Sequence, residues 1–266
     1  MRSSWCLSFL VLAGACSSPP PPKPPPPPDP PKEEAPPPAE PVVQEELGSI
    51  DNDAIDGAFG GIENDIESCL VAGRARVSTL GGDVTVFMRI DTQGHVRWSY
   101  LQASTLGDRD TEKCLLDLMS RSQWPAPVGG EAEVTHSFGG DSASRRSPVS
   151  WESEKVTFAI DASQPTRRAI NQCKHGANGT IDLTGYVVAG APPAPGTDSK
   201  KPGVKKHRKK PAKAKAKAKP EGHFRAIGAA SASKDAAGKI DCVIDSVKSL
   251  PLPSPGSSTA KVSFSL

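Results

Sequence analysis

Cysteine is the residue type in this chain with the clearest capacity for chemistry, and four of the six cysteines form two matching pairs. Cys69 and Cys114 flank one hairpin pattern, and Cys173 and Cys242 flank a second one. In an oxidising compartment we expect disulfides Cys69–Cys114 and Cys173–Cys242. Closing the first loop of 45 residues should stabilise the fold by about 4 kcal/mol on the loop-entropy model.

Other chemistry is not expected of the cysteines or histidines. The chain has no Cys-x-x-Cys pair and no histidine recurs at ligand spacing, which argues against zinc and redox sites. Gly-His-x-Arg occurs at 94–97 and at 222–225, but no nucleophile or carboxylate recurs beside it. We therefore expect Gly94 at a positive-φ turn, with His95 and Arg97 on the solvent side of a strand. The sequence predicts no catalytic residue, cofactor, metal or small-molecule substrate.

The two Gly-His-x-Arg motifs belong to a longer repeat. Residues 94–138 align with 222–266 at a constant shift of 128 residues, without a gap. The shift matches Cys114 with Cys242, Asp117 with Asp245, Pro125 with Pro253, Pro127 with Pro255, and Val134 with Val262. This pattern indicates an internal duplication, and hence two copies of one small module.

Periodicity predicts the order helix, strand, strand, helix, strand for the first copy. Apolar residues at steps of three and four predict a helix over 50–70, capped by Asp51 or Asp53 and followed by Gly73. Alternation predicts a hairpin from a strand over 83–91 and a return strand with Val96, Trp98 and Tyr100 on one face. A helix capped by Asp108 and a strand over 131–138 complete the copy.

The second copy follows the same order, with an insertion at the hairpin tip. A short strand over 156–160 precedes a helix over 165–173, and the hairpin strands cover 179–188 and 222–228. A helix starting at Ser233 or Asp235 buries Ile240, Val243, Ile244 and Val247, and the last strand covers 262–266. The insertion, 190–221, falls where extra loop length costs little free energy.

The N-terminal residues have the pattern of an export signal. Arg2 precedes an apolar run over 5–15 that is too short to span a bilayer. The run ends in Leu-Ala-Gly-Ala-Cys at 12–16, which resembles a bacterial lipobox and implies lipidation of Cys16. The alternative is an ordinary signal peptide with a chance cysteine. Since Ser17 and not Asp follows Cys16, the resemblance implies anchoring to the outer membrane, with the domains in the periplasm.

Proline dominates the stretch that follows. Fifteen of the 23 residues in 19–41 are proline, so neither helix nor sheet is expected there. Residues 16–46 are therefore interpreted as a disordered tether between the lipid and the folded part.

A cationic segment is the most function-like feature of the second copy. Residues 198–221 carry eleven Lys or Arg and two acids, a net charge of +9, which leaves −7 for the rest of a chain whose total is +2. The basic residues are Lys200, Lys201, Lys205, Lys206, Arg208, Lys209, Lys210, Lys213, Lys215, Lys217 and Lys219. Such density is typical of polyanion binding, for example to lipopolysaccharide, anionic lipid, peptidoglycan or nucleic acid. A solvated loop with no dedicated partner is an equal alternative.

Four short motifs, taken in order, resemble the C-terminal domain of TonB-type proteins in its myxobacterial gliding-motility (AgmX/PglI) variant. They are Gly-Asp-Val-Thr-Val at 82–86, Ile-Asp-x-x-Gly-x-Val at 90–96, Ala-Ser-Thr-Leu at 103–106 and Trp-Pro-Ala-Pro at 124–127. Cys69 and Cys114 match the cysteine-bearing variant, and the second copy matches more loosely. The resemblance implies a small α+β fold that binds envelope proteins, often by adding a strand at a sheet edge. The lipid anchor in place of an inner-membrane helix departs from the family pattern.

Together these observations predict an α+β protein with two small tandem-repeat domains after a tether. The expected parts are a signal peptide (1–15), the lipidated cysteine and tether (16–46), a first domain (47–140), a linker (141–150) and a second domain (151–266) with the disordered insertion 190–221. The function predicted is non-enzymatic binding or scaffolding of envelope proteins, in a motility or trafficking assembly. The alternative is an anionic polymer as partner, bound through the Lys-rich insertion.

Overall fold

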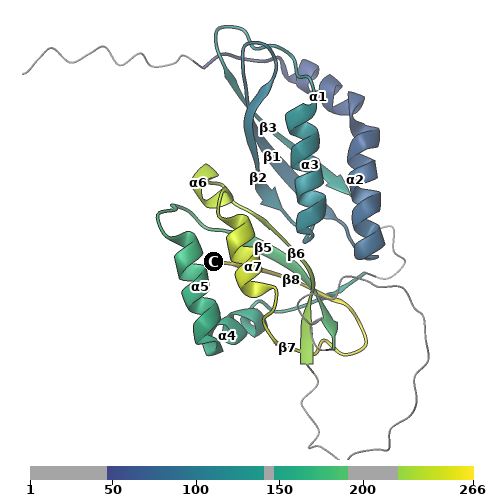
Figure 1. The fold of residues 1–266 in the computed structure, drawn as a ribbon. Helices are drawn as coiled ribbons and strands as arrows, with labels where there is room; N and C mark the ends of the chain where they lie inside the picture. Colours follow the sequence, from purple (N-terminus) through teal and green to yellow (C-terminus); the bar gives the residue numbers. More distant parts are fainter. Residues whose placement is uncertain (1–46, 141–146, 191–220) are drawn as a thin grey trace, which may run out of the picture. The chain divides into compact units, whose positions relative to one another are not determined.

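Two sheets, each with helices packed on one face, form the α+β fold of the computed structural model (Figure 1). Residues 47–140, 147–190 and 221–266 are described. We call 47–140 the first half and the described part of 147–266 the second half. The α+β class is the one that the sequence predicts.

The first half contains α1 (Asn52–Gly61), α2 (Glu63–Arg76), β1 (Gly82–Ile90), β2 (Val96–Ser104), α3 (Arg109–Arg121) and β3 (Ala132–Gly140). Its sheet has the order β2-β1-β3, and both pairings are antiparallel. β1 buries Val84, Val86, Met88 and Ile90 against the helices, as its alternation predicts. β3 is therefore an edge strand with one neighbour.

The first helix differs from its predicted form. The carboxylate of Asp51 caps α1 by accepting from the backbone N–H of Asp53. The predicted helix is interrupted at Ile62. A second helix, α2, then runs to Arg76, so that Gly73 lies inside this helix and not after its end. A Cβ at Gly73 would come within 2.2 Å of the Thr111 hydroxyl oxygen. Gly73 thus allows α2 to approach α3 closely.

Contrary to the prediction, the side chains of Val96, Trp98 and Tyr100 do not all lie on one face of β2. Its register with β1 shifts at Arg97, so Val96 pairs with Ile90 on the helix side while Trp98 pairs with Arg89. Trp98 and Tyr100 instead stack with Phe87, at ring-centroid distances of 5.3 and 5.2 Å. A bulge of this kind adds one residue to one strand and so reverses the phase of the side chains.

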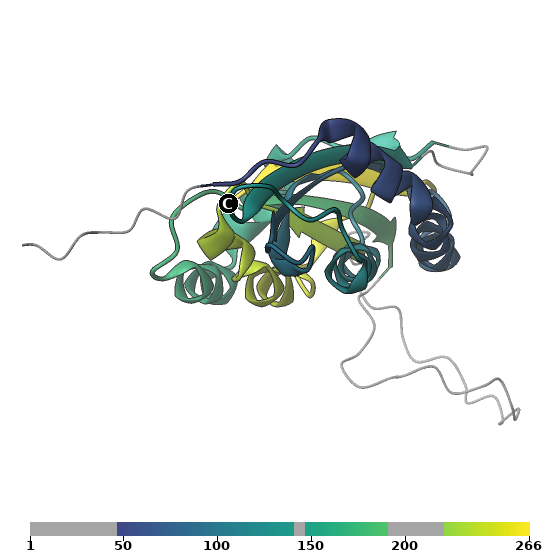
Figure 2. The same cartoon turned by 90° about the horizontal axis from the view of Figure 1, so that it is seen from above.

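The second half contains β4 (Val149–Ser150), α4 (Glu154–Ala162), α5 (Gln164–Lys174), β5 (Asp182–Ala189), β6 (Glu221–Ala230), α6 (Lys234–Ala237), α7 (Ile240–Val247), β7 (Leu252–Pro253) and β8 (Ala260–Ser265). Its sheet has the order β4-β8-β5-β6-β7. Figure 2 shows α5 and α7 side by side on one face of this sheet. The four residues predicted to face inward from the last helix, Ile240, Val243, Ile244 and Val247, are buried.

One sequence prediction for the second half is wrong, and two segment boundaries differ from those predicted. Residues 156–160 form α4 and not a strand, because Val156 and Ile160 are buried one helical turn apart while Phe158 between them is 77% exposed. The predicted linker 141–150 ends in a strand, since β4 pairs in parallel with the start of β8. The insertion is also slightly shorter than predicted, because the backbone N–H of Gly190 donates to the carbonyl of Glu221, the first residue of β6.

The two halves belong to one compact unit, 44–266. β2 lies against β6, and the backbone N–H of Ser231 donates to the carbonyl of Leu101 at 2.9 Å. The buried side chain of Tyr186 packs with Val77 and Leu80 of the first half. We call this contact surface the seam.

Candidate functional site

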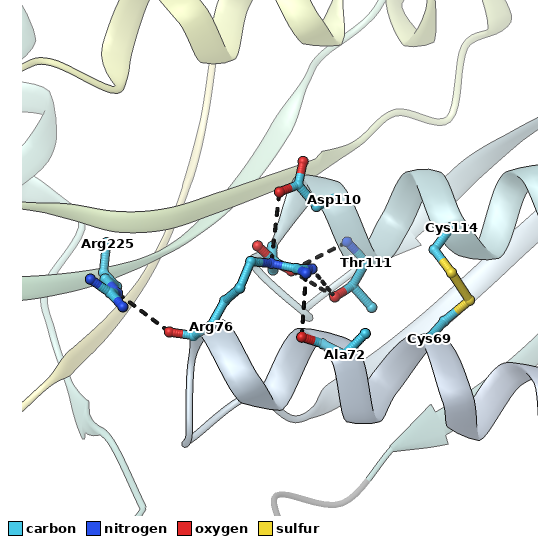
Figure 3. A network of polar contacts seen from close by, with 8 residues as sticks. Cys69, Ala72, Arg76, Asp110, Thr111, Cys114 and Arg225 are labelled. Carbon is cyan, nitrogen blue, oxygen red and sulfur yellow. Dashed lines mark hydrogen bonds and ion pairs between the residues drawn. A yellow bond between two sulfur atoms is a disulfide. The ribbon is translucent and has the colours of Figure 1, made fainter. Parts of the chain in front are cut away.

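Both disulfides that the sequence predicts are present. Cys69 of α2 is bonded to Cys114 of α3, and Cys173 of α5 is bonded to Cys242 of α7. Figure 3 shows the first bond joining its two helices. In each half the bond ties together the helices that cover the sheet, which is a structural role.

The repeated Gly-His-x-Arg motifs lie at the surface and do not share an environment. Gly94 has a φ of +84°, and the His95 side chain beside it is 66% exposed. Arg97 forms an ion pair with Glu131 at 2.6 Å. His223, in contrast, contacts the carbonyl of Gly190 through Nδ1 at 2.9 Å. The solvent-facing position predicted for His95 and Arg97 is confirmed.

A groove lies between β3 and the helices α1 and α2. We call it the edge groove; it has a volume of about 770 Å³. It is lined by Asp56, Phe59, Gly60, Glu63, Asn64, Ile66, Glu67 and Leu70 of α1 and α2, and by His136, Phe138 and Gly139 of β3. A hollow of about 560 Å³ adjoins it at Asp56 and His136 and extends it toward the start of β3.

The floor of the edge groove is aromatic and aliphatic. The His136 ring stacks on Phe59 with centroids 3.7 Å apart, and Phe138 lies 6.1 Å from Phe59. These contacts follow from the pleat of β3, which places Val134, His136 and Phe138 on the helix side at alternate positions. Phe59 is itself buried, at 5% exposure. Most of its side chain therefore packs in the core, and little of its surface is open to the groove.

The rim of the edge groove is acidic. Asp56, Glu63 and Glu67 stand on the helix side, and the side chains of Asp56 and Glu67 are 68% and 54% exposed. Glu67 is paired with Arg74 at 2.6 Å, and Asp56 lies 3.5 Å from His136 Nδ1. Among the described residues that line the groove, none is a lysine or an arginine.

The second feature of the site is the outer backbone edge of β3. In the described part of the chain, β3 pairs with β1 alone, so its outer edge carries unpaired N–H and C=O groups along nine residues. Just before this strand, the N–H of Gly48 donates to the carbonyl of Glu131, and Ser49 forms an isolated antiparallel bridge with Val128. The arrangement can accept an extended chain, with backbone bonds to β3 and alternate side chains in the groove.

No family model, curated protein or solved structure matches this chain.

No pattern in the sequence predicted the edge groove. The predicted helix over 50–70 contains Phe59 and Ile66, and the predicted strand over 131–138 contains His136. Those placements are correct, but whether such residues also border an open edge depends on sheet order. The order β2-β1-β3 places β3 at the edge of the sheet, and the sequence does not specify this order.

A polar network lies at the end of α2 near the seam (Figure 3). The guanidinium of Arg76 donates to the Asp108 carboxylate and, at 3.1 Å, to the Thr111 hydroxyl. The hydrogen bond to Asp108 raises the pKa of Arg76. From the second half, Arg225 donates to the backbone carbonyl of Arg76 at 3.3 Å.

Glu112 is the one fully buried acid reported in the described chain, and it bridges the seam. Its carboxylate accepts from the Ser104 hydroxyl at 2.8 Å and from the backbone N–H of Ala229, in the second half, at 2.9 Å. Desolvation raises the pKa of Glu112 to about 7, against the opposing effects of these two hydrogen bonds and of Arg109. The seam thus contains a group whose charge changes near neutral pH.

The remaining predicted sites lie outside the described residues. These are Cys16 and the Lys-rich insertion between 200 and 219. Within the described ranges no helix is long and apolar enough to cross a membrane, and no group of three or more His, Cys, Asp or Glu side chains is placed to hold a metal ion.

Proposed function

We propose that this protein is a non-enzymatic lipoprotein of the cell envelope that binds or scaffolds other envelope proteins. The observation that carries the proposal is the uncovered edge of β3 beside the edge groove. An outer-membrane anchor at Cys16 and a place in a motility or trafficking assembly are what the sequence resemblances suggest. The Pro-rich tether would hold the folded part away from the lipid.

Strand addition is the binding mode that the groove favours. An extended segment of a partner would pair with the backbone of β3, which supplies affinity without regard to sequence. Every second side chain of the added strand would enter the groove over Phe59, His136 and Phe138, which supplies specificity. A long uncovered edge strand otherwise invites aggregation, so an edge of nine residues is better explained by a partner.

The second half supports the same assignment by contrast. The strand that corresponds to β3, β8, is paired at its start with β4 of the same chain and is therefore not the outermost strand of its sheet. The N–H groups of Val149 and Trp151 donate to the carbonyls of Thr259 and Lys261. We therefore assign partner binding to the first half.

Site-specific photocrosslinking in cells tests the proposal. A crosslinking residue at Thr135 or Ser137 of β3 should capture a defined protein, and Ile66→Arg in the groove should abolish the capture. The same crosslinking residue at Phe158, exposed on α4, is the control. Capture that persists in Ile66→Arg, with the circular dichroism spectrum unchanged, would rule out binding through the groove.

Polyanion binding through the Lys-rich insertion is the second candidate, favoured by its net charge of +9 in a chain that is otherwise acidic. Deleting residues 200–219 separates the two functions. A scaffold keeps its groove-dependent crosslink after the deletion, whereas a polyanion binder loses retention on heparin.

A further inference from the structure

We infer that the edge groove binds an extended segment of a partner protein that carries lysine or arginine at alternate positions. This inference rests on the proposed function, strand addition to β3, and goes beyond it by naming the chemistry of the partner.

The charge of the rim selects a cation. Asp56, Glu63 and Glu67 line the helix side of the groove, and Glu133 lines the adjoining hollow. Glu67 and Glu133 are already paired, with Arg74 at 2.6 Å and Arg89 at 3.0 Å. Glu63, together with Asp56, whose neighbour His136 at 3.5 Å carries a charge only when it is protonated, supplies the negative charge that an incoming segment would meet first. An acidic segment would be repelled.

The floor selects a long side chain with an apolar stem. A side chain that enters from an added strand crosses the surface made by Phe59, Leu70 and Phe138 before it reaches the carboxylates on α1 and α2. Lysine and arginine match this order, because their methylene stems cover apolar surface while the charged head stays at the rim. A short polar side chain would not reach the rim, and a purely apolar one would leave the carboxylates without a partner.

The period of the side chains along β3 indicates that the cationic residues of the partner occupy alternate positions. His136 and Phe138 line the edge groove and Val134 lines the adjoining hollow, so every second residue of β3 takes part, and an added strand has the same period. Only every second residue of the partner therefore meets the groove, while the residues between them face away from it. The partner segment is expected to read as cationic residues separated by single small or β-branched residues.

Peptide binding to the purified protein tests the inference. The probes are nine-residue peptides of alternating lysine and threonine, with glutamine or glutamate replacing lysine in two matched peptides. We expect the lysine peptide to bind about threefold to tenfold more tightly than the glutamine peptide at 0.15 M salt, the range for two exposed ion pairs, and the glutamate peptide to bind least. The double variant Asp56→Asn, Glu63→Gln should remove the advantage of lysine over glutamine. The matched control, Glu154→Gln with Asp161→Asn on α4, should keep it.

The outcomes separate this inference from the proposed function. If the lysine and glutamine peptides bind equally and backbone N-methylation abolishes both, strand addition stands and the cationic partner is overturned. If no peptide binds, both are overturned. A protein that is dimeric in solution and becomes monomeric when residues 200–219 are deleted would assign the groove to a second copy, which overturns a foreign partner.

Discussion

At the scale of single residues, Glu112 contributes a pH dependence to the stability of the fold. Burial raises its pKa from an ordinary 4.5 to about 7, so between these values the folded state holds a proton that the unfolded chain releases. Stability from this group is therefore fully present below pH 4.5 and declines as the pH rises toward 7. The groups that face it are Ser104, Asp108 and Arg109 of its own half and the backbone of Ala229.

Replacing Glu112 with glutamine is predicted to remove this pH dependence. The amide can accept from the N–H of Ala229 and donate to the Ser104 hydroxyl without carrying charge. The wild-type protein should lose about 3 kcal/mol of unfolding free energy relative to Glu112→Gln between pH 4.5 and pH 8. Guanidinium unfolding of both proteins at several pH values measures the difference, and parallel pH profiles would contradict the raised pKa.

The role of Glu112 could not have been inferred from the sequence. It lies in the first turn of α3 after the cap residue Asp108, where an acid is usually a solvated partner of the helix dipole. Its burial depends on Gly228 across the seam, where a Cβ would lie 2.1 Å from the Glu112 carboxylate oxygen. Two residues separated by more than a hundred positions share no local signal, whereas the cap at Asp108 was predictable because capping is local.

At the scale of elements, each half depends on a disulfide between two helices on the same face of a sheet. Loop closure over 45 and 69 residues contributes about 4 kcal/mol in each case on the entropy model. The sequence was sufficient to predict both pairings, because cysteine positions and helix periodicity are local and occur in the same order in both halves.

We predict that Cys69→Ser with Cys114→Ser lowers the unfolding free energy of the first half by about 4 kcal/mol. Near-ultraviolet circular dichroism in denaturant, with and without reductant, measures the loss. The matched pair Cys173→Ser with Cys242→Ser should weaken the second half by a similar amount. The entropic account would be wrong if reductant left the wild-type unfolding midpoint unchanged.

Other elements were mispredicted where packing overrides a local pattern. Val156, Phe158 and Ile160 alternate as in a strand, but α4 buries only the first and last of them. In β2 the bulge at Arg97 moves Trp98 to the face opposite Val96. A period of two and a helical step of four coincide over five residues, so sequence alone cannot separate them.

At the scale of the whole molecule, the seam joins the halves by contacts that differ in chemistry. The amine of Lys261 donates to the carbonyl of Gly81 at 2.7 Å, and burial lowers its pKa. The Tyr186 hydroxyl donates to the carbonyl of Thr79, and Arg109 pairs with Asp241 at 2.8 Å. None of these pairs could be predicted from the sequence, because its local patterns specify the elements of each half and not the surface between the halves.

The seam predicts that the halves stay associated after the chain between them is cut. A protease site placed within 141–146 should yield two fragments that elute together in size-exclusion chromatography at micromolar concentration. Because Glu112 leaves its buried position when the fragments separate, association takes up a proton between pH 4.5 and 7. The dissociation constant should therefore be up to about a hundredfold larger at pH 8 than at pH 5, and Glu112→Gln should flatten this change. Fragments that separate at every pH would show that the tandem halves are independent domains.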